Sequence, residues 1–418
     1  MTFATTIPSH WQSGNIRRFA EMKSGHTPSR SVLAYWENTE IPWFTLADVW
    51  QLRDGKQIYL GDTANKINEL GLANSAAELL PAGTVVLSRT ASVGFSGVMP
   101  RPMATSQDFW NWVCGPELIP EYLNYQFKSM TAEFKSLNMG STHQTIYQKD
   151  AATLRIVVPP LEEQRAIADY LDRETVRIDT LIEEQQRLIE MLRERRRAAV
   201  EEAVSTVATS GARLKHVIRS VRQGWSPQCY SWPADGVETW AVLKAGAANG
   251  GRFRPMENKE LPEEEIPRPA IVVTRGDLIV SRANTRELVG SAAVVEGDFP
   301  RLMLCDKLYA FSLDESRAES RFVAAVLGSR RWRDLIELEA TGASHSMLNI
   351  SQSDIVNLPM SLPPVDEQRR VVARLNSETA KIDQLIAETE RFIELARERR
   401  AALITAAVTA QIDVREMM

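Results

Sequence analysis

The chain has 418 residues, of which 44% are hydrophobic and 25% are charged, and its net charge is −5. Single hydrophobic cores stop growing near roughly 250 to 300 residues, so at least two globular units are expected, and no apolar run approaches the roughly 20 residues that span a bilayer. The net negative charge argues mildly against a nucleic-acid-binding protein, because Lys and Arg supply most non-specific affinity for phosphates.

The first residues, MTFATTIPSHW, contain neither the basic region nor the apolar stretch of a secretory signal, so the sequence predicts a cytoplasmic protein. The cysteines Cys114, Cys229 and Cys305 are odd in number, far apart and without metal-ligand spacing. That pattern is typical of a reducing compartment, with thiols that are buried or incidental.

Residues 1–157 are predicted to form a mixed α/β arm. This arm contains Gly25-His26-Thr27-Pro28, a strand-like GTVVLSRT at 83–90 and a polar loop GSTHQTI at 140–146. The strand-like segment is apolar and ends in polar residues, which places its end at the surface.

Residues 158–210 are predicted to form a long helix. Its apolar positions step by four, three, four and three residues, the seam of a coiled coil, at Ile178, Ile182, Gln185, Ile189 and Leu192. Prolines at its start suit a first helical turn, where a missing N–H has no cost. At 1.5 Å per residue, a helix from Pro160 to Val204 is roughly 65 to 70 Å long.

Residues 211–361 and 362–418 repeat the arm and the helix. At an offset of 204, the segments Pro159 to Val204 and Pro363 to Val408 are identical at 23 of 46 positions. The arms match more weakly but in the same order, through Gly224-Trp225-Ser226-Pro227, GDLIVSRA at 276–283 and GASHSMLNI at 342–350. The second seam is formed by Ile382, Ile386, Thr389, Ile393 and Ala396. The predicted fold class is therefore α+β, arranged as a tandem repeat.

The two helices are expected to pair. A lone helix would leave its apolar stripe in water, and the second helix carries the matching stripe. The compact arrangement is antiparallel, with the arms at opposite ends and related by an approximate two-fold axis. Such a spacer can measure the distance between two DNA half-sites, which lie about 34 Å apart for each helical turn.

The PPLEEQR and PPVDEQR motifs at 159–165 and 363–369, and the Gly-led loop before each, resemble the specificity subunit of Type I restriction-modification systems over essentially the whole chain. The resemblance implies two target recognition domains, each of which reads half of a bipartite double-stranded DNA target, and two spacer helices. The helices would dock two methyltransferase subunits and, in a full complex, motor and nuclease subunits. It also implies no cofactor for this chain, whereas the partners use S-adenosylmethionine, ATP and Mg²⁺.

Missing motifs agree with a non-catalytic subunit. The sequence has no GxxxxGK[ST] phosphate loop, no Asn-Pro-Pro-Tyr or Asp-Pro-Pro-Tyr signature, and no CxxC or HExxH metal motif. Its five histidines lack ligand spacing. The periodic carboxylates of the helices predict a solvated face.

Direct readout of bases needs Arg or Lys for guanine and Asn or Gln for adenine, with Ser, Thr or His as supplements. Arg89 and Arg282 recur in both arms, which favours a framework role or a phosphate contact over base readout. Gln144 is the better candidate for adenine, because its counterpart Ser346 differs. The candidate DNA contacts are Lys56, Gln57, Ser88, Arg89, Thr90, Thr142, His143, Gln144, Arg252, Arg254, Ser281, Arg282, Asn284, Arg286, Ser344, His345 and Ser346.

Several alternatives remain open at this point. His143 and His345 either touch DNA or cap the junction between arm and helix, and Trp43 and Trp240 are expected in the cores. The RERR segments at 193–196 and 397–400 are either partner-binding surfaces or solvated helix faces. A protein-binding scaffold without DNA affinity is the main rival function, and a hydrolytic enzyme is the second.

Overall fold

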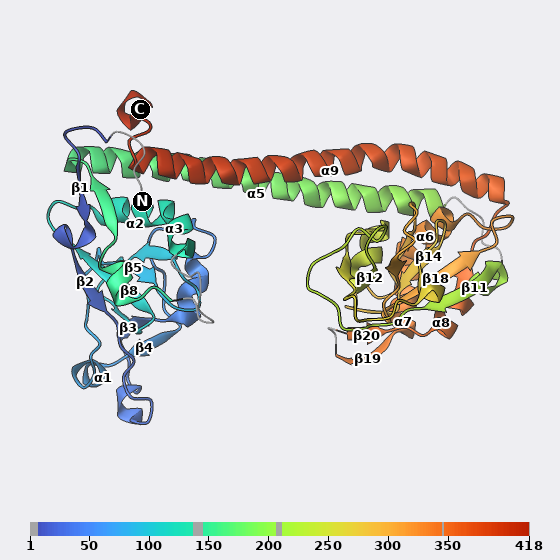
Figure 1. Ribbon diagram of the computed structural model, residues 1–418, viewed down its shortest axis with the longest axis horizontal. Coiled ribbons are helices and arrows are strands. Elements are labelled where there is room, and N and C mark those ends of the chain that lie inside the picture. The colour runs from blue at the N-terminus through green and yellow to red at the C-terminus, as the bar shows by residue number, and fades with distance from the viewer. Residues whose placement is uncertain (1–6, 137–144, 206–210, 345–346, 418) are drawn as a thin grey trace. The chain divides into compact units, whose positions relative to one another are not determined.

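A computed structural model describes residues 7–136, 145–205, 211–344 and 347–417. The chain divides into two compact units, residues 1–187 with 389–418 and residues 188–388. Each unit holds one arm and one end of each long helix, and the predicted α+β class is confirmed (Figure 1).

Arm 1 precedes the first long helix and is built from short strands and helices. Its elements are β1 (Gln12–Asn15), β2 (Ala20–Ser24), β3 (Ile41–Phe44), β4 (Asn65–Ile67), α1 (Glu69–Ala73), β5 (Val85–Ser88), β6 (Ser96–Val98), β7 (Ala104–Thr105), β8 (Phe109–Cys114), α2 (Pro120–Ser129), α3 (Thr131–Ser136), α4 (Gln148–Ala151) and β9 (Arg155–Val158).

Arm 2 lies between the two long helices and follows a similar order. Its elements are β10 (Ala212–Arg213), β11 (Ile218–Gln223), β12 (Ala241–Leu243), β13 (Asn258–Glu260), β14 (Leu278–Ser281), β15 (Ala283–Asn284), β16 (Ala292–Val294), β17 (Leu302–Met303), β18 (Leu308–Leu313), α6 (Ser320–Gly328), α7 (Arg330–Glu339), β19 (Thr341–Ser344), β20 (Met347–Asn349), α8 (Gln352–Asn357) and β21 (Pro359–Met360).

The two arms share one sheet topology. A four-stranded antiparallel sheet has the order β2-β8-β5-β6 in arm 1 and β11-β18-β14-β16 in arm 2. A three-stranded sheet, β4-β3-β7 or β13-β12-β17, contains one parallel pair in each arm. Arm 2 contains a small sheet, β15-β20-β19, at the place where the described residues of arm 1 form a bridge between Thr90 and Thr145. The weak sequence match between the arms therefore corresponds to a duplicated fold.

The long helices are α5 (Leu161–Ser205) and α9 (Val365–Val408). In the unit that contains arm 1, Arg400 of α9 donates to Asp179 of α5 at 3.1 Å. In the other unit, Arg196 of α5 donates to Asp383 of α9 at 2.9 Å. The residue later in α5 therefore pairs with the residue earlier in α9. This order confirms the predicted antiparallel pairing.

The predicted seam is largely buried. Ile178, Ile182, Ile189 and Leu192 of α5 are at most 9% exposed, as are Ile382 and Ile393 of α9. Ile386 is only partly buried. The predicted polar seam position Thr389 is 7% exposed, so both helices bury the face that their periodicity indicated.

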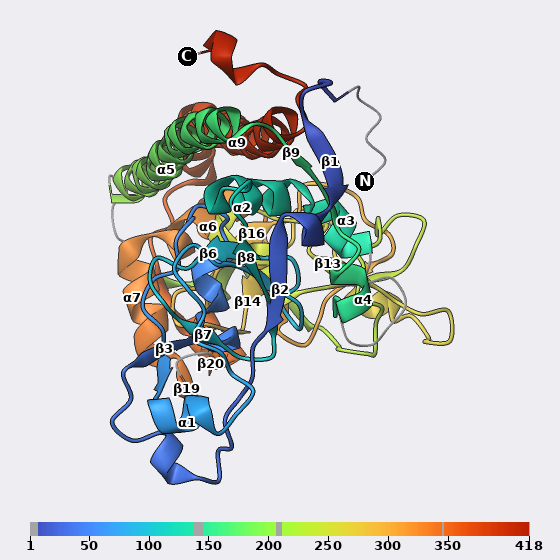
Figure 2. The same cartoon turned by 90° about the vertical axis from the view of Figure 1, so that its left-hand side faces the viewer.

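Each arm joins its core to the ends of the helices. In arm 1, α2 lies between the helix pair and the four-stranded sheet (Figures 1 and 2), and Tyr122 of α2 packs in one cluster with Leu171 and Val408. In arm 2, Phe322 of α6 packs in the equivalent cluster with Val204. The helix ends are therefore part of the arm cores.

A buried glutamine ties each arm to the helix that follows it. The side-chain oxygen of Gln164 accepts from the backbone N–H of Ile119 at 2.8 Å, and its amide donates to the carbonyls of Glu117 and Pro159. Gln368 makes the same three bonds, with the N–H of Glu319 and the carbonyls of Arg317 and Pro363. Both glutamines have no exposed surface. They are the Gln of the two EQR motifs.

Candidate nucleic-acid interface

The candidate interface of each arm is the loop that follows β5 in arm 1 and β14 in arm 2. It runs from Ser88 to Gly94 in arm 1 and from Ser281 to Gly290 in arm 2, so its ends are alike whereas its middle is three residues longer in arm 2. The N–H of Gly94 donates to the carbonyl of Ser88 at 2.9 Å, and that of Gly290 to the carbonyl of Ser281 at 2.6 Å. Both glycines have positive φ, a conformation that suits residues without a Cβ.

Ser88 and Ser281 support this loop from inside. Both have no exposed surface. The Ser88 hydroxyl donates to the carbonyl of Ser92 and accepts from the N–H of Phe95. Burial removes both side chains from direct reach of a ligand, contrary to the expectation that they contact DNA.

Arg89 and Arg282 are the second residues of the loops and have matching backbone bonds. The N–H of Arg89 donates to the carbonyl of Asp108, and its own carbonyl accepts from the N–H of Ile146. Arg282 makes the same two bonds with Lys307 and Ile350. The main chain therefore holds both arginines at the same place in the fold.

The two guanidinium groups are also held alike. That of Arg89 lies 4.3 Å from the ring centre of Trp110, and that of Arg282 lies 5.8 Å from the ring centre of Tyr309. These rings occupy equivalent positions, second in β8 and β18. Both arginines are partly buried, and the burial lowers the pKa of Arg89.

The sequence reasoning missed the polar residues of the turn at 106–108, whose Asp108 carbonyl accepts from the Arg89 N–H. Thr90 donates to the carboxylate of Asp108 at 2.7 Å, and Ser106 donates to the other oxygen of the same carboxylate at 2.8 Å. Thr27 donates to Gln107 at 2.6 Å, and Gln107 is exposed. Thr27 belongs to the recurring GHTP motif, which gave a weak sequence signal for its importance. The turn at 106–108 belongs to no recurring motif and gave no such signal.

Arm 2 repeats part of this arrangement with different residues. Ser226, the counterpart of Thr27, donates to Asp306. Lys307 replaces Asp108 beside the arginine, and Asn284 donates to Asn249 at 3.2 Å. The scaffold is shared, but the groups that it presents differ.

Close backbone contacts explain the glycines of the GHTP and GWSP motifs. A Cβ on Gly25 would lie 2.2 Å from the carbonyl oxygen of Ser106, and a Cβ on Gly224 would lie 2.2 Å from that of Cys305. Only glycine fits at either position. The two motifs therefore lock the turn next to each arginine.

The other predicted contacts have varied surroundings. Lys56 forms an ion pair with Glu183 of α5 at 2.6 Å, so it joins arm 1 to the helix. Arg286 pairs with Glu337 at 3.1 Å and remains half exposed. Arg252 and Arg254 are exposed in a Gly-rich loop. Trp43 is buried, as expected for a core residue, and Trp240 is partly buried against the second arm's core.

The polar loops before the helices are described only at their edges. Thr142, His143, Gln144, His345 and Ser346 lie outside the described residues. The backbone of Ser344 belongs to β19, and its side chain lies outside the description. Predictions for these six residues stay predictions. The described ends of the loops hydrogen-bond to Arg89 and Arg282 through the N–H groups of the two isoleucines named above.

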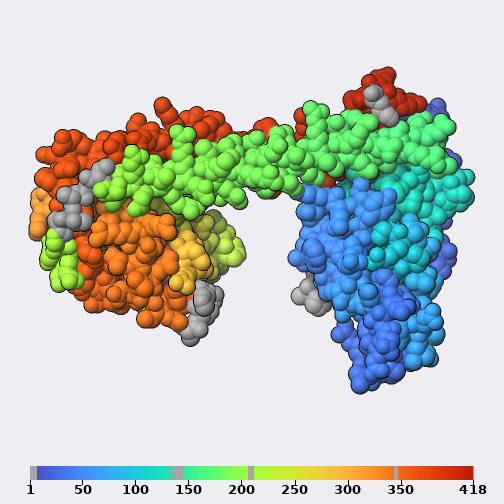
Figure 3. Space-filling view, turned by 180° about the vertical axis from the view of Figure 1, so that it is seen from behind, coloured from blue at the N-terminus to red at the C-terminus, as the bar shows by residue number. Residues whose placement is uncertain are grey.

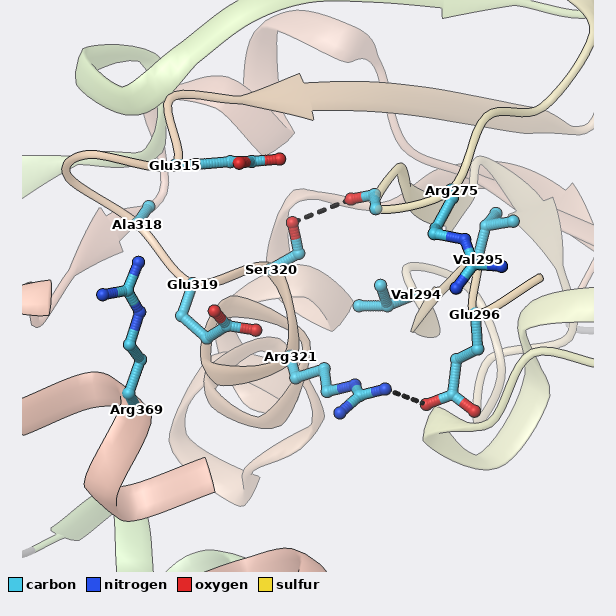
Figure 4. Close-up of a pocket in the computed structure, with 11 residues that line it drawn as sticks. Arg275, Val294, Val295, Glu296, Glu315, Ala318, Glu319, Ser320, Arg321 and Arg369 are labelled. Atoms are coloured by element: carbon cyan, nitrogen blue, oxygen red, sulfur yellow. Dashed lines mark hydrogen bonds and ion pairs between the residues drawn. The ribbon is translucent and has the colours of Figure 1, made fainter. Parts of the chain in front are cut away.

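An open pocket in arm 2 has a different character (Figure 4). Its cations are neutralised locally, since Arg321 pairs with Glu296 at 3.1 Å and Arg275 with Asp298 at 2.6 Å. Ser320 closes one side by donating to the carbonyl of Gly276 at 2.8 Å. The pocket therefore offers no unpaired charge from these residues to a ligand.

The described residues were compared with the requirements of a metal site and of a membrane-spanning helix. Among them, no group of three or more His, Cys, Asp or Glu residues is arranged to hold a metal ion. Among the same residues, no helix combines the length and the apolar character required to cross a membrane.

Comparisons with known proteins give the same family as the resemblance. Residues 8–191 match the model of the Type I restriction modification DNA specificity domain. The chain is 32% identical over 173 residues to the specificity subunit of Type I restriction enzyme EcoEI of Escherichia coli, a match that covers 41% of this chain and 29% of that protein. It is 30% identical over 188 residues to the MjaIX specificity subunit of Methanocaldococcus jannaschii, with 44% and 42% covered. The chain thus spans less than half the length of these two relatives.

Solved structures share the fold over nearly the full length. A chain from a study of complex assembly and conformational transition of the type I R-M system has a TM-score of 0.67 at 17% identity, and the match covers 97% of this chain and 99% of that one. The HsdS subunit from Thermoanaerobacter tengcongensis has a TM-score of 0.52 at 18% identity, with 99% and 100% covered. The predicted resemblance to Type I specificity subunits is confirmed.

Proposed function

We propose that this chain is the DNA specificity subunit of a Type I restriction-modification complex and that it reads a bipartite target, one half-site for each arm. The observation that carries the proposal is the duplicated arm, whose shared scaffold holds loops of different length and different polar residues at the same place. Two readers on one framework suit two dissimilar half-sites. The domain family of residues 8–191 supports a DNA target.

Catalysis is assigned to partner subunits. The relatives of this chain are named as specificity subunits, and the sequence lacks the signatures of methyl transfer and nucleotide hydrolysis. The partners would use S-adenosylmethionine, ATP and Mg²⁺, and this chain would need no cofactor. The complex would act in the cytoplasm, where it would meet its DNA target.

A repeated apolar stripe supports docking of two copies of one partner. Leu181, Leu188 and Met191 of α5 are 36% to 58% exposed, and their equivalents at the offset of 204, Leu385, Phe392 and Leu395 of α9, are 42% to 49% exposed. Spacings of seven and three residues place each set on one helix face. The outer face of α5 is open in Figure 3. Exposed apolar surface that recurs in both copies fits a partner bound twice.

The bipartite reading is tested by mapping methylated bases in a host that expresses the chain with its methyltransferase. One bipartite motif should be methylated only when this chain is present. Replacement of residues 1–157 by the arm of a relative with another target should change one half of the motif, and replacement of residues 211–361 should change the other half. An exchange of either arm that alters both halves would contradict one half-site for each arm.

The rival scaffold function makes the opposite prediction. A protein-binding scaffold would assemble with partners but would not alter the methylated motif, and it would show no salt-dependent affinity for duplex DNA. An unchanged motif after removal of the chain would therefore replace our proposal with the scaffold. Turnover of a substrate by the purified chain alone would contradict the non-catalytic assignment.

A further inference from the structure

The loops of the two arms differ in length and in their middle residues, but both contain the same arginine, Arg89 in arm 1 and Arg282 in arm 2. Arg89 and Arg282 keep their backbone bonds and their aromatic supports, while the neighbouring side chains change from Asp108 to Lys307 and from Gln107 to Asp306. If the arms read different base sequences, a group that both retain in one geometry suits a part of DNA that both half-sites have in common. That part is the phosphodiester backbone.

The guanidinium groups retain donors for an anion. In each arginine the Nε is buried without a hydrogen-bond partner among the described residues, so an anion from outside would be bound by the terminal Nη groups. The carboxylate of Asp108, whose backbone carbonyl accepts from the Arg89 N–H, is occupied by Thr90 and Ser106. Arg282 makes one long bond, 3.4 Å, to the carbonyl of Asp306. Within the described part of the chain, neither arginine forms an ion pair with a carboxylate.

The aromatic rings explain how such cations are kept in place. Trp110 and Tyr309 are each 4% exposed, and a buried ring face attracts a guanidinium and fixes its plane without neutralising its charge. A planar fork in a fixed orientation is suited to two parallel bonds with phosphate oxygens. Each arginine lies near the start of the loop whose middle differs between the arms. A phosphate bound by the arginine would therefore set the position of the loop residues that contact bases.

We propose that Arg89 and Arg282 are equivalent phosphate clamps, each of which binds one backbone phosphate of its half-site and sets the register of the variable loop without selecting bases. This inference rests on the proposed function, because it assumes that both arms bind duplex DNA. It adds that the two arginines act alike and independently of sequence.

The test uses the complete complex of this chain with its methyltransferase subunits. Affinity for the target duplex and for a scrambled duplex is measured by fluorescence anisotropy over a range of salt concentrations. Arg89→Gln and Arg282→Gln should each weaken binding to both duplexes by a similar factor, roughly tenfold at low salt, and should each reduce the slope of log affinity against log salt by about one. Arg101→Gln is the matched control, since Arg101 is an exposed arm 1 arginine paired with Asp62 elsewhere on the surface.

Interference by phosphate ethylation locates the contacts. The wild-type complex should show one phosphate in each half-site whose ethylation no longer matters after the substitution in the corresponding arm. Arg89→Lys and Arg282→Lys keep the charge and should retain the salt slope while losing part of the affinity, because lysine lacks the planar fork. These conservative variants keep the test valid if a Gln variant fails to fold.

Each other outcome overturns the inference. A loss confined to the target duplex, or a changed methylation motif, would make the arginines base readers. Unchanged affinity and salt slope with a lower melting temperature would make them framework residues. Absence of DNA binding by the wild-type complex would instead refute the proposed function, which separates the two failures.

Discussion

Gln164 and Gln368 each satisfy one backbone N–H and two carbonyls where an arm meets its helix. Gln164→Leu should lower the free energy of unfolding by roughly 2 to 3 kcal/mol, because it leaves these buried groups without partners. Gln368→Leu should have an effect of the same size in the other unit. Thermal unfolding followed by circular dichroism measures the loss.

The control for this change is Gln186→Leu, on an exposed position of the same helix, which should alter the melting temperature little. Equal stability of the Gln164→Leu and Gln186→Leu proteins would show that the junction does not depend on the amide.

Lys128 should give the stability of arm 1 a dependence on pH. Its ammonium donates to the carbonyls of Gly55 and Gln57, and burial, followed by the nearby charge of Arg400, lowers its pKa to about 8 from the usual 10.5. Between those two values the unfolded chain binds more protons, so stability should rise with pH from about 8 to 10.5. The rise, relative to Lys128→Met, should be roughly 2 kcal/mol once partial solvent exposure is allowed for.

Urea unfolding at several pH values measures this difference, with Lys66→Met at an exposed position of β4 as the control. A wild-type curve parallel to that of Lys128→Met through the alkaline range would rule out a shifted lysine.

Residue roles were only partly predictable from the sequence. Recurrence of Arg89 and Arg282 directed attention to one position that the two arms share, but Ser88 and Ser281 carry the same recurrence because they are buried loop supports. The EQR motif was visible, whereas the burial of its glutamine was not, since a polar residue beside two acids suggests a solvated helix start. The signal that could have found it is its identity in both copies at the point of helix entry.

At the scale of elements, the duplication supplies two versions of one interhelical ion pair. Arg400 and Asp179 are 13% and 14% exposed, whereas Arg196 and Asp383 are 26% and 31% exposed. Arg400 also donates to the carbonyl of Gly55 at 2.9 Å. A less hydrated pair should be coupled more strongly, so alanine double-mutant cycles should give about 1 to 2 kcal/mol for Arg400 with Asp179 and about 0.5 kcal/mol for Arg196 with Asp383.

Urea unfolding of the wild-type, single-variant and double-variant proteins measures the coupling energy of each ion pair. Hydrogen exchange along α5 shows which end of the helix each substitution destabilises. Equal coupling energies for the two pairs would mean that burial does not govern them.

The long helices were predictable because their signal is local, although α9 ends at Val408, ten residues before the predicted bound. First-turn acids and a seven-residue repeat lie within each helix, and the prolines lie directly before it. The sheets were visible only as fragments, since their central pairs join residues far apart in sequence, such as Val86 with Asn111 and Val280 with Tyr309. Strand order depends on these long-range pairs and was visible only in the structure. The duplicated topology explains why the sequences of the arms match weakly but in the same order.

At the scale of the whole molecule, the duplication predicts how many partners bind. Substitution of serine for Leu181, Leu188 and Met191 removes the exposed stripe of α5, and substitution for Leu385, Phe392 and Leu395 removes that of α9. If each stripe contributes one docking site for the same protein, either triple variant should retain one methyltransferase copy in place of two. Exposed positions tolerate such changes with little loss of stability.

Native mass spectrometry of the assembled complex counts the copies directly. Val176→Ser is the control, because Val176 is 64% exposed on α5 but its equivalent in α9 is Ala380, so it lies outside the repeated stripe. A chain that still binds two copies after either triple substitution would exclude the stripes as docking sites. A chain that loses both copies after only one triple substitution would show that the two partners assemble cooperatively, and the stripes would then act as parts of a single interface.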